Sequence, residues 1–438
     1  MLDKSTRRDF LRQSTAIGTG AIILPQLIPS TALGMGGKVA PSDRIVMGCI
    51  GTGSQGTGNL REFLKNHLDR VQFIAICDVD AKHAANAKGV IDTANKNSDC
   101  KAYGDYREFL EKEKLDGVSI ALPDHWHGLI YTAAANKKLD VYGEKPLART
   151  IHDGQAIVSA AKRNNIVWQT GSWQRSRENF RRGAELAVNG RVGKVTRVEV
   201  GLPNGNRGVG TPPIKEVPAE LNWEMWLGPA LKVPYRGISH WDWRWILDYS
   251  GGQLTDWSGH HIDIAQWGIG MERSGPIEIA GEAVYPTDGI YNAPVEYDFL
   301  CKYANGIEMR VANEARIEKG SGATWYGDKG WIHVNRGNTL TASDPKILEE
   351  VIADNEIHLY KSTDHIGNFL DCVKSRGETV APVDIAHRSI SVGLLGEIAM
   401  STGQKIQWDP VKQEIIGNPQ ASRLLTRPYR QPWNVPTI

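Results

Sequence analysis

The chain has 438 residues, 41% of them hydrophobic, and its 51 Lys and Arg nearly balance 50 Asp and Glu. This length exceeds one typical core, so we expect two domains, and the hydrophobic share excludes a disordered chain. Because the net charge is close to zero and no dense basic run follows the N-terminal segment, we expect no nucleic-acid partner. The five cysteines are not closely paired, and we interpret them as small buried hydrophobic residues.

Residues 1–32 are typical of an export signal. Adjacent Arg7 and Arg8 precede a weakly apolar run over residues 16–24, and small residues end the segment. This pattern resembles a twin-arginine signal and predicts export to the periplasm, whereas the alternative is an ordinary basic amphipathic N-terminus. We interpret residues 33–42 as a linker. No later run reaches about 18 apolar residues, so we expect no integral membrane segment in the mature protein.

A strand over residues 44–50 is predicted to run directly into a glycine-rich loop and then into a helix over residues 58–68. In the loop, Gly51 permits a tight turn, Gly53 lets the backbone approach a pyrophosphate, and Gly56 lets the helix pack on the strand. This order of strand, loop and helix predicts a dinucleotide site. The residues that we place at the cofactor in this loop are Gly51, Gly53, Ser54, Gln55 and Gly56.

The second predicted strand, residues 71–77, ends in Asp78, about 20 residues after the last loop glycine. A carboxylate there accepts hydrogen bonds from the ribose hydroxyls and repels a 2′-phosphate, so we predict NAD rather than NADP. The alternative is that Asp78 is a turn or cap residue before a helix at Asp80. A third strand over residues 117–122 continues the alternation, so residues 43–170 are predicted to form a doubly wound parallel sheet.

Two further motifs follow, Pro123-Asp-His-Trp-His127 and Val-Tyr-Gly-Glu144-Lys145-Pro. Together with the glycine loop they resemble the glucose-fructose oxidoreductase / inositol dehydrogenase (Gfo/Idh/MocA) family over nearly all of the chain after the signal. The resemblance implies that Lys145 lies beside nicotinamide and substrate, with Glu144 orienting the lysine or the cofactor. It also brings Pro123 and His127 near the nicotinamide, although His127 is equally explained as a capping or packing residue. Neither histidine of the first motif belongs to a zinc-type ligand set, so we predict no metal site.

After a last Rossmann strand at residues 166–170, the chain is expected to cross into a second α/β domain over residues 171–402, built on a large, mostly antiparallel open sheet. At the crossing, Gln174 suits a carboxamide and Arg175 suits sugar hydroxyls, but a hinge salt bridge explains Arg175 nearly as well. The resemblance implies that this sheet self-associates into a dimer or tetramer. Residues 403–438 are interpreted as an extended C-terminal arm.

Asp256 and His260 are four residues apart in a predicted helix, which would place carboxylate and imidazole on one face. This spacing matches the family's Asp-x-x-x-His pair, in which His260 takes the hydroxyl proton and Asp256 orients it. The alternative is an internal salt bridge. Just before this helix, an aromatic-rich segment offers Trp243 and Arg244 as sugar contacts, or else forms a buried aromatic cluster.

These residues predict an NAD-dependent oxidoreductase that oxidises a secondary hydroxyl of a sugar or glycoside, at C3 by analogy, to give a 3-keto-glycoside. His260 serves as base, Asp256 orients it and Lys145 stabilises the alkoxide. Because free NAD is scarce outside the cytoplasm, we expect tightly bound NAD(H) that a second substrate recycles. The first alternative is a glycoside hydrolase that uses bound NAD for transient oxidation and elimination. The second is a non-catalytic dinucleotide sensor or sugar-binding module.

Overall fold

The computed structural model describes residues 43–237 and 242–438. The predicted export signal and linker lie outside these residues, and so does the start of the aromatic segment before Asp242. Residues 45–438 form a single unit. No helix in the part of the chain that the structure describes is long and apolar enough to cross a membrane.

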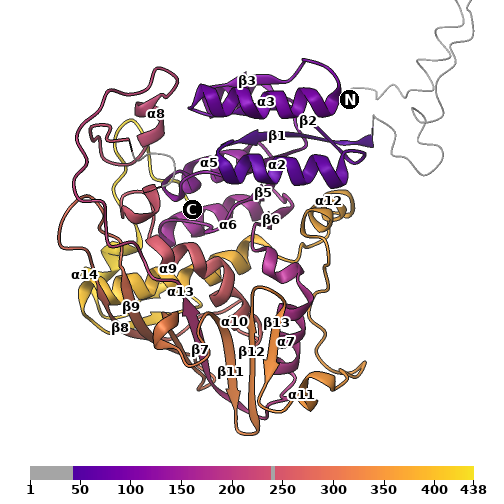
Figure 1. Ribbon diagram of the computed structural model, residues 1–438, viewed down its shortest axis with the longest axis vertical. Helices are drawn as coiled ribbons and strands as arrows, with labels where there is room; N and C mark the ends of the chain where they lie inside the picture. The colour runs from indigo at the N-terminus through magenta and orange to yellow at the C-terminus, as the bar shows by residue number, and fades with distance from the viewer. Residues whose placement is uncertain (1–42, 238–241) are drawn as a thin grey trace, which may run out of the picture. The chain divides into compact units, whose positions relative to one another are not determined.

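The N-terminal half contains a six-stranded sheet in the order β3-β2-β1-β4-β5-β6, and every neighbouring pair is parallel (Figure 1). Strand order reverses between β1 and β4, and ligands of open α/β sheets bind at the carboxyl ends of strands at such a point. The strands are β1 (Ile45–Ile50), β2 (Val71–Cys77), β3 (Lys101–Tyr103), β4 (Gly117–Ile120), β5 (Asp140–Gly143) and β6 (Trp168–Thr170).

Some helices of this half begin at capping side chains that their sequences supply. Asp80 accepts hydrogen bonds from the backbone N–H groups of Lys82 and His83, and Thr150 accepts one from that of Asp153. Such caps satisfy N–H groups that have no partner inside the helix. The helices are α2 (Ser54–His67), α3 (Ala81–Asn95), α4 (Tyr106–Lys112), α5 (His127–Asn136) and α6 (Ile151–Arg163).

The second half contains a nine-stranded mixed sheet in the order β13-β12-β11-β7-β10-β9-β8-β14-β15 (Figure 1). Only the β7–β10 pair is parallel among its described strands, so the predicted fold class is confirmed. The strands are β7 (Val195–Leu202), β8 (Glu278–Val284), β9 (Glu296–Lys302), β10 (Glu308–Asn313), β11 (Gly322–Gly327), β12 (Gly330–Asn335), β13 (Thr339–Ala342), β14 (Ile406–Asp409) and β15 (Glu414–Ile415).

Side chains alternate between the two faces of this sheet. In β9, Tyr297, Phe299 and Cys301 are buried, whereas Asp298 and Lys302 on the other face are not fully buried. Helices α7 (Glu178–Val188), α10 (Asp263–Trp267) and α13 (Val383–Thr402) cover the buried face. The remaining helices are α8 (Trp223–Leu227), α9 (Gly252–Trp257), α11 (Lys346–Glu349), α12 (His365–Ser375) and α14 (Pro419–Ser422).

Helix α12 packs on the N-terminal half, although the sequence placed it in the second domain. Phe369 and Leu370 join Phe63 and Tyr142 in one buried cluster, and the Phe369 ring lies edge-on to the other two rings. The Rossmann core is therefore completed by a helix from the C-terminal part of the chain.

The C-terminal arm is less extended than the sequence suggested. It starts with β14 and β15, which lengthen the second sheet, and its last residues return to the N-terminal half. There the ring of Trp433 packs edge-on against Trp126, and Tyr429 donates a hydrogen bond to Asp153 at 2.8 Å. All five cysteines are free and buried, as predicted.

Candidate active site

The glycine loop between β1 and α2 has the geometry that its spacing predicts. Gly51 has φ +79°, and a Cβ atom there would lie 2.1 Å from the carbonyl oxygen of Ala121. A Cβ atom on Gly56 would lie 2.0 Å from the carbonyl oxygen of Gly51. No larger residue fits at either position, so the turn and the close helix–strand contact both require glycine.

Gly53 differs because the space beside it is open. A Cβ atom on Gly53 would meet only the ring of His83, at 3.9 Å. Gly53 also precedes α2 without any side-chain cap, and the first turn of this helix carries no acidic residue. Free N–H groups and the positive end of the helix dipole therefore face an open space, as a bound pyrophosphate requires.

Asp78 is held rigidly at the end of β2. Its Oδ2 accepts hydrogen bonds from the backbone N–H of Thr52 at 2.7 Å and from the Thr52 hydroxyl at 3.0 Å. Its Oδ1 accepts one from the N–H of Asp80 at 2.9 Å. Asp80 is itself the N-cap of α3, so Asp78 is not the cap, but its hydrogen bond from the N–H of Asp80 is that of the turn residue that the alternative also named. Loop, helix terminus and carboxylate together fit the phosphates and ribose of a dinucleotide.

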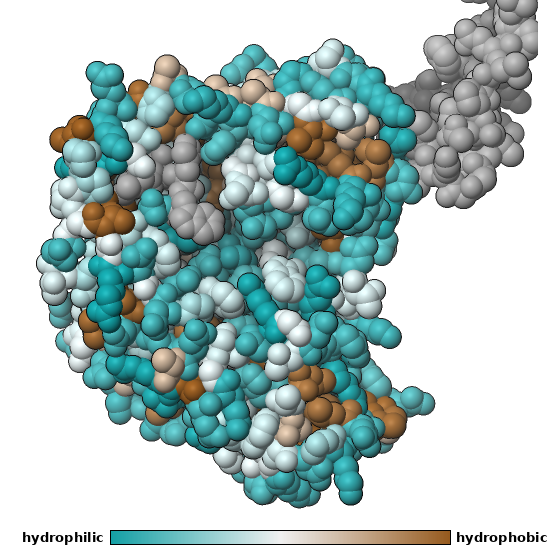
Figure 2. Space-filling view, in the orientation of Figure 1, coloured by the Kyte–Doolittle hydropathy of each residue, from teal (hydrophilic) through white to brown (hydrophobic). Residues whose placement is uncertain are grey.

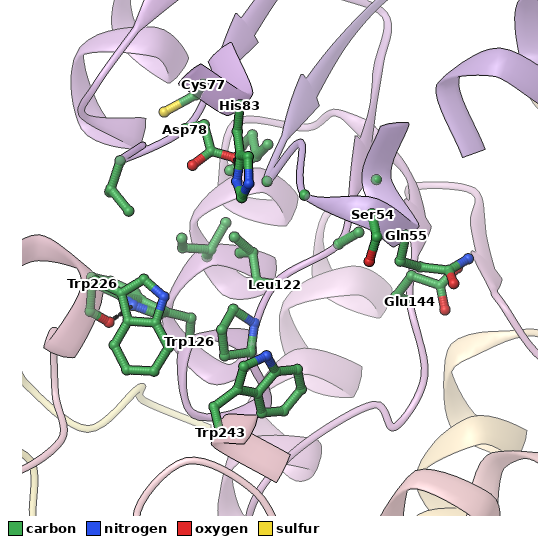
Figure 3. A pocket seen from close by; sticks show the side chains of 18 of the residues that line it. Ser54, Gln55, Cys77, Asp78, His83, Leu122, Trp126, Glu144, Trp226 and Trp243 are labelled. Atoms are coloured by element: carbon green, nitrogen blue, oxygen red, sulfur yellow. Dashed lines mark hydrogen bonds and ion pairs between the residues drawn. The ribbon is translucent and has the colours of Figure 1, made fainter. Parts of the chain in front are cut away.

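These groups line one pocket, which extends toward an aromatic wall (Figure 3). Asp78 and His83 lie at one end, while Trp126, Trp226 and Trp243 line another part of it. Figure 2 shows that this face of the molecule is hollowed and largely hydrophilic around the hollow. The pocket brings together most of the predicted site residues: Gly51, Gly53, Ser54, Gln55, Gly56, Asp78, Pro123, Glu144, Lys145, Trp243, Arg244 and Asp256.

At one end of the pocket Lys145 pairs with Asp256. The Lys145 ammonium donates a hydrogen bond to Oδ1 of Asp256 at 2.9 Å, and Nε of Arg244 lies 3.7 Å from the same oxygen. Burial by itself would raise the pKa of Asp256, but the charges of Lys145 and Arg244 outweigh it, so that this pKa is lowered. Asp256 is therefore an anion held between cations.

Glu144 connects the segment after β5, which carries Lys145, to helix α2. Its Oε1 accepts hydrogen bonds from Asn59 at 2.9 Å and Gln55 at 3.2 Å, and its Oε2 accepts one from the backbone N–H of Lys145 at 3.2 Å. Burial raises the pKa of Glu144, and the nearby Lys145 opposes this rise. Glu144 thus orients the backbone at Lys145 and fixes Gln55.

Asp256 and His260 lie on helical residues, as predicted, but the helix is not a regular α-helix, and the described structure does not pair the two side chains. A π-helical turn (Ser258–Ile262) interrupts the helix between α9 and α10, and the N–H of Asp263 reaches back five residues to the carbonyl of Ser258. A π turn changes which residues share a face. None of the hydrogen bonds among the described residues joins Asp256 to His260, because Asp256 pairs with Lys145 instead.

Although His260 does not pair with Asp256, the π turn brings it close to Lys145. Gly259 lies against Lys145, since a Cβ atom on Gly259 would come within 2.9 Å of the Lys145 Cβ. Burial lowers the pKa of His260 well below its usual value, and the charges of Lys145 and Arg336 lower it further. Its buried Nδ1 has no hydrogen-bond partner in the part of the chain that the structure describes. His260 is therefore held as a neutral imidazole.

Arg175 is a structural residue rather than a substrate contact. Its guanidinium donates to both carboxylate oxygens of Asp263, at 2.6 and 2.9 Å, and to Glu272 at 2.7 Å. It also stacks on Trp267, 4.6 Å from the ring centroid. The salt-bridge alternative thus describes Arg175, and the predicted substrate role is wrong because its hydrogen bonds are already used within the protein.

His127, Gln174 and the buried His260 are not among the residues that line this pocket in the described part of the chain. The ring nitrogens of His127 lie 2.7 Å from the carbonyl of Pro146 and 3.0 Å from that of Leu122, which favours its packing role over cofactor contact. Gln174 is buried, with Nε2 at 3.5 Å from Nδ1 of His261. No group of three or more His, Cys, Asp or Glu side chains in residues 43–237 and 242–438 is arranged to bind a metal.

Two residues near the site were not predicted from the sequence. Asp124 is buried and accepts a hydrogen bond from Ser250 at 2.6 Å, and burial raises the pKa of its carboxyl to about 7. Its position inside the Pro123–His127 motif is the sequence feature that could have identified it as a site residue. Arg336 follows β12 and lies over Trp257, and no local pattern could have linked it to a site so distant in sequence.

Comparison with known proteins agrees with this geometry. Residues 45–172 match the oxidoreductase family's NAD-binding Rossmann fold, and residues 204–435 match its C-terminal α/β domain. The WlbA dehydrogenase from Bordetella pertussis, solved in complex with NADH and UDP-GlcNAcA, superposes with a TM-score of 0.61 at 15% identity, over 84% of this chain and 99% of that one.

Two curated relatives resemble shorter stretches. A glycosyl hydrolase family 109 protein from Shewanella pealeana is 28% identical over 174 residues, 36% of this chain and 38% of the relative. Inositol 2-dehydrogenase from Salmonella typhimurium is 28% identical over 148 residues, 34% of this chain and 42% of the relative. The chain thus spans about two fifths of the length of the curated relatives it matches. Taken with the two matched domains, the chain belongs to the Gfo/Idh/MocA oxidoreductase family and binds NAD.

Proposed function

We propose that the protein oxidises a secondary hydroxyl of a sugar or glycoside at the end of its NAD pocket. The observation that carries this proposal is the Lys145–Asp256 ion pair, with Nζ and Oδ1 2.9 Å apart, beside the neutral imidazole of His260. An ammonium group that faces a reacting hydroxyl stabilises alkoxide charge, and a neutral imidazole accepts the proton. When bound, nicotinamide supplies the acceptor for the hydride that leaves the carbon.

Each residue has a distinct part in this reaction. Lys145 positions the hydroxyl oxygen and stabilises its negative charge, and Asp256 holds the ammonium in place. His260 takes the hydroxyl proton, since burial and neighbouring cations keep it unprotonated. Glu144 fixes the lysine backbone relative to α2.

Carbohydrate is the substrate class that best suits the polar end of the pocket. Trp243 offers an indole face, and Arg244 stacks on it with the guanidinium carbon 4.5 Å from the ring centroid. Aromatic faces pack on the C–H groups of sugar rings while cations hold hydroxyls. The inositol 2-dehydrogenase relative supports this class. By analogy we place the oxidation at C3 of a glycoside, which yields a 3-keto-glycoside.

A strap from the second half supports tight cofactor retention. Near the adenosine end of the pocket, Asp80 and Leu221 form an antiparallel bridge. The N–H of Ala81 donates to the carbonyl of Glu220 at 2.8 Å, and that of Asn222 donates to the carbonyl of Val79 at 2.9 Å. These contacts would hinder release of NAD if this segment covers the bound cofactor. A retained cofactor suits an exported periplasmic enzyme in which a second substrate restores the oxidised form.

Self-association is part of the proposal. The outer face of the second sheet carries cross-strand ion pairs, including Arg310 to Asp298 at 2.6 Å. The family resemblance supports a homodimer or homotetramer formed through this sheet.

The test uses purified full-length protein and the absorbance of its bound cofactor. Mixing with a panel of sugars and glycosides should convert bound NAD to NADH, seen at about 340 nm. His260→Ala should retain the cofactor but lose the response. If the native protein holds NAD yet no sugar changes its redox state, the proposed reaction is wrong.

A glycoside hydrolase that uses bound NAD transiently is the second candidate, because a glycosyl hydrolase family 109 protein resembles this chain. Oxidation would acidify a neighbouring C–H, elimination would expel the aglycone, water would add to the resulting double bond, and reduction of the ketone by the bound NADH would restore the sugar hydroxyl. Release of nitrophenol from nitrophenyl glycosides without net NADH formation would favour this candidate over dehydrogenation.

A further inference from the structure

Arg336 lies in the turn of the β12–β13 hairpin, between two indole rings that border His260. Its guanidinium carbon is 4.3 Å from the ring centroid of Trp257 and 5.1 Å from that of Trp173. The ring of His260 is 5.6 Å from the first indole and 6.2 Å from the second. A hairpin from the second sheet thus brings a cation to the edge of the proposed catalytic residues.

This cation has no carboxylate of its own. None of the ion pairs among the described residues includes Arg336, and its buried Nε has no hydrogen-bond partner there. The buried arginines Arg149 and Arg175 are paired with Glu397 and Asp263, whereas the partly buried Arg388 and Arg427 donate to backbone carbonyls. Burying part of a guanidinium whose N–H donors have no partner costs free energy of folding, unless a ligand binds to those donors.

The charges around Asp256 leave an excess of cations. Lys145, Arg244 and Arg336 all act on this one carboxylate. Two further acids, Glu144 and Asp124, interact with Lys145, but both are buried, and burial raises the pKa of each, which disfavours their charged forms. One carboxylate facing three cations leaves the substrate end of the site positively charged.

We propose that Arg336 binds an anionic group on the substrate, so that the enzyme prefers sugars carrying a carboxylate or a phosphate ester. This inference rests on the proposed function and adds the substrate's charge to it. The planar guanidinium offers paired N–H donors that match carboxylate and phosphate oxygens. Stacking between Trp257 and Trp173 fixes its plane, while Lys145 and His260 remain available to the hydroxyl.

The test compares charged and uncharged versions of the same sugar on the cofactor-loaded full chain. Glucuronate and glucose 6-phosphate are assayed beside glucuronamide and glucose, and binding is followed independently by tryptophan fluorescence. We expect the native protein to prefer one of the two anions. At a pH above the acid limb of the activity profile, Arg336→Gln should raise KM for that anion by about 10- to 100-fold, with little change in kcat and no effect on the neutral sugars. Arg336→Lys should recover part of the loss.

Arg177→Gln is the matched control. Arg177 is exposed and also lies over Trp173, at 5.3 Å, without acting on Asp256 or His260. It should leave KM within about twofold, because an exposed cation is screened by solvent. A preference for glucuronate over glucose 6-phosphate, or the reverse, identifies the anion.

Equal KM changes for charged and neutral sugars, or no preference for anions in the native protein, would overturn the inference while leaving the oxidation reaction intact. If no sugar reduces the cofactor, the proposed function fails, and fluorescence titration with glucuronate and glucose 6-phosphate still decides the role of Arg336. Anion binding that persists in Arg336→Gln would refute it.

Discussion

Lys145 donates a hydrogen bond to Asp256 across 111 residues of sequence, joining the last part of the Rossmann half to helix α9. The pairing gives Asp256 a different task from the one its spacing to His260 suggested. It balances and fixes the lysine instead of orienting the imidazole.

A double-mutant cycle distinguishes these two tasks. Asp256→Asn and Lys145→Met should each reduce kcat/KM by roughly 10²- to 10³-fold, but the double variant should lose little more than either alone. Asp256→Asn and His260→Asn should combine nearly independently, since they share no hydrogen bond. The opposite pattern of coupling would restore the Asp256–His260 pair.

The pH profile of kcat/KM should report the lowered pKa of His260. A base must be unprotonated, so activity falls as pH drops through its pKa, and the lowered pKa moves this loss below about pH 6.5. Arg336→Gln removes a cation that disfavours the protonated imidazole, so the loss should begin at a higher pH. An acid limb that does not move would show that His260 is not the titrating base.

Asp124 should make the folded protein less stable as pH rises. Its pKa is raised to about 7 by burial, above the 3.8 of an ordinary Asp, so the stability is fully present below about pH 4 and is lost between pH 4 and 7. Three pKa units correspond to about 4 kcal/mol as an upper limit. Asp124→Asn should show a smaller loss in urea unfolding across this range. Asn at the exposed Asp99 is the control and should leave the pH dependence unchanged.

Asp78 should decide the choice between NAD and NADP. Asp78→Ser removes the carboxylate that the ribose hydroxyls need and the repulsion toward a 2′-phosphate, so NAD affinity should fall about 10- to 100-fold while NADP binding improves. Titration of protein freed of cofactor, with both nucleotides, measures this. Unchanged selectivity would mean that Asp78 does not contact the ribose and only accepts hydrogen bonds from Thr52.

Arg175 should matter for stability and little for substrate choice. Arg175→Gln leaves the carboxylate of Asp263 buried without its cation, and such a loss costs about 3–5 kcal/mol of unfolding free energy. Urea unfolding tests this value. The ratio of kcat/KM between two sugar substrates should stay constant, and a changed ratio would argue for direct substrate contact.

The parts of the site that follow from local sequence were predictable. The glycine loop and Asp78 belong to one strand–loop–helix–strand unit, so spacing alone places them together. Lys145 was identified through its motif. Within the second half, strand segments were recognisable from alternation, but their order in the sheet depends on pairings distant in sequence, such as β7 with β10.

The errors arose where tertiary contacts override helical spacing. Four-residue spacing predicts one face only if the helix is regular, and the π turn at Ser258–Ile262 changes that register. Arg175 was misassigned because its two acidic partners, Asp263 and Glu272, lie 88 and 97 residues away. Arg336 was missed for the same reason, since its position next to Trp173 is created by sheet pairing.

The packing of α12 on the N-terminal half affects when that half can complete its core during synthesis. Phe369 and Leu370 complete the core around Phe63, yet they are synthesised long after the last Rossmann strand. The N-terminal half therefore emerges from the ribosome with an apolar face uncovered, and it reaches its final packing only when most of the chain is complete.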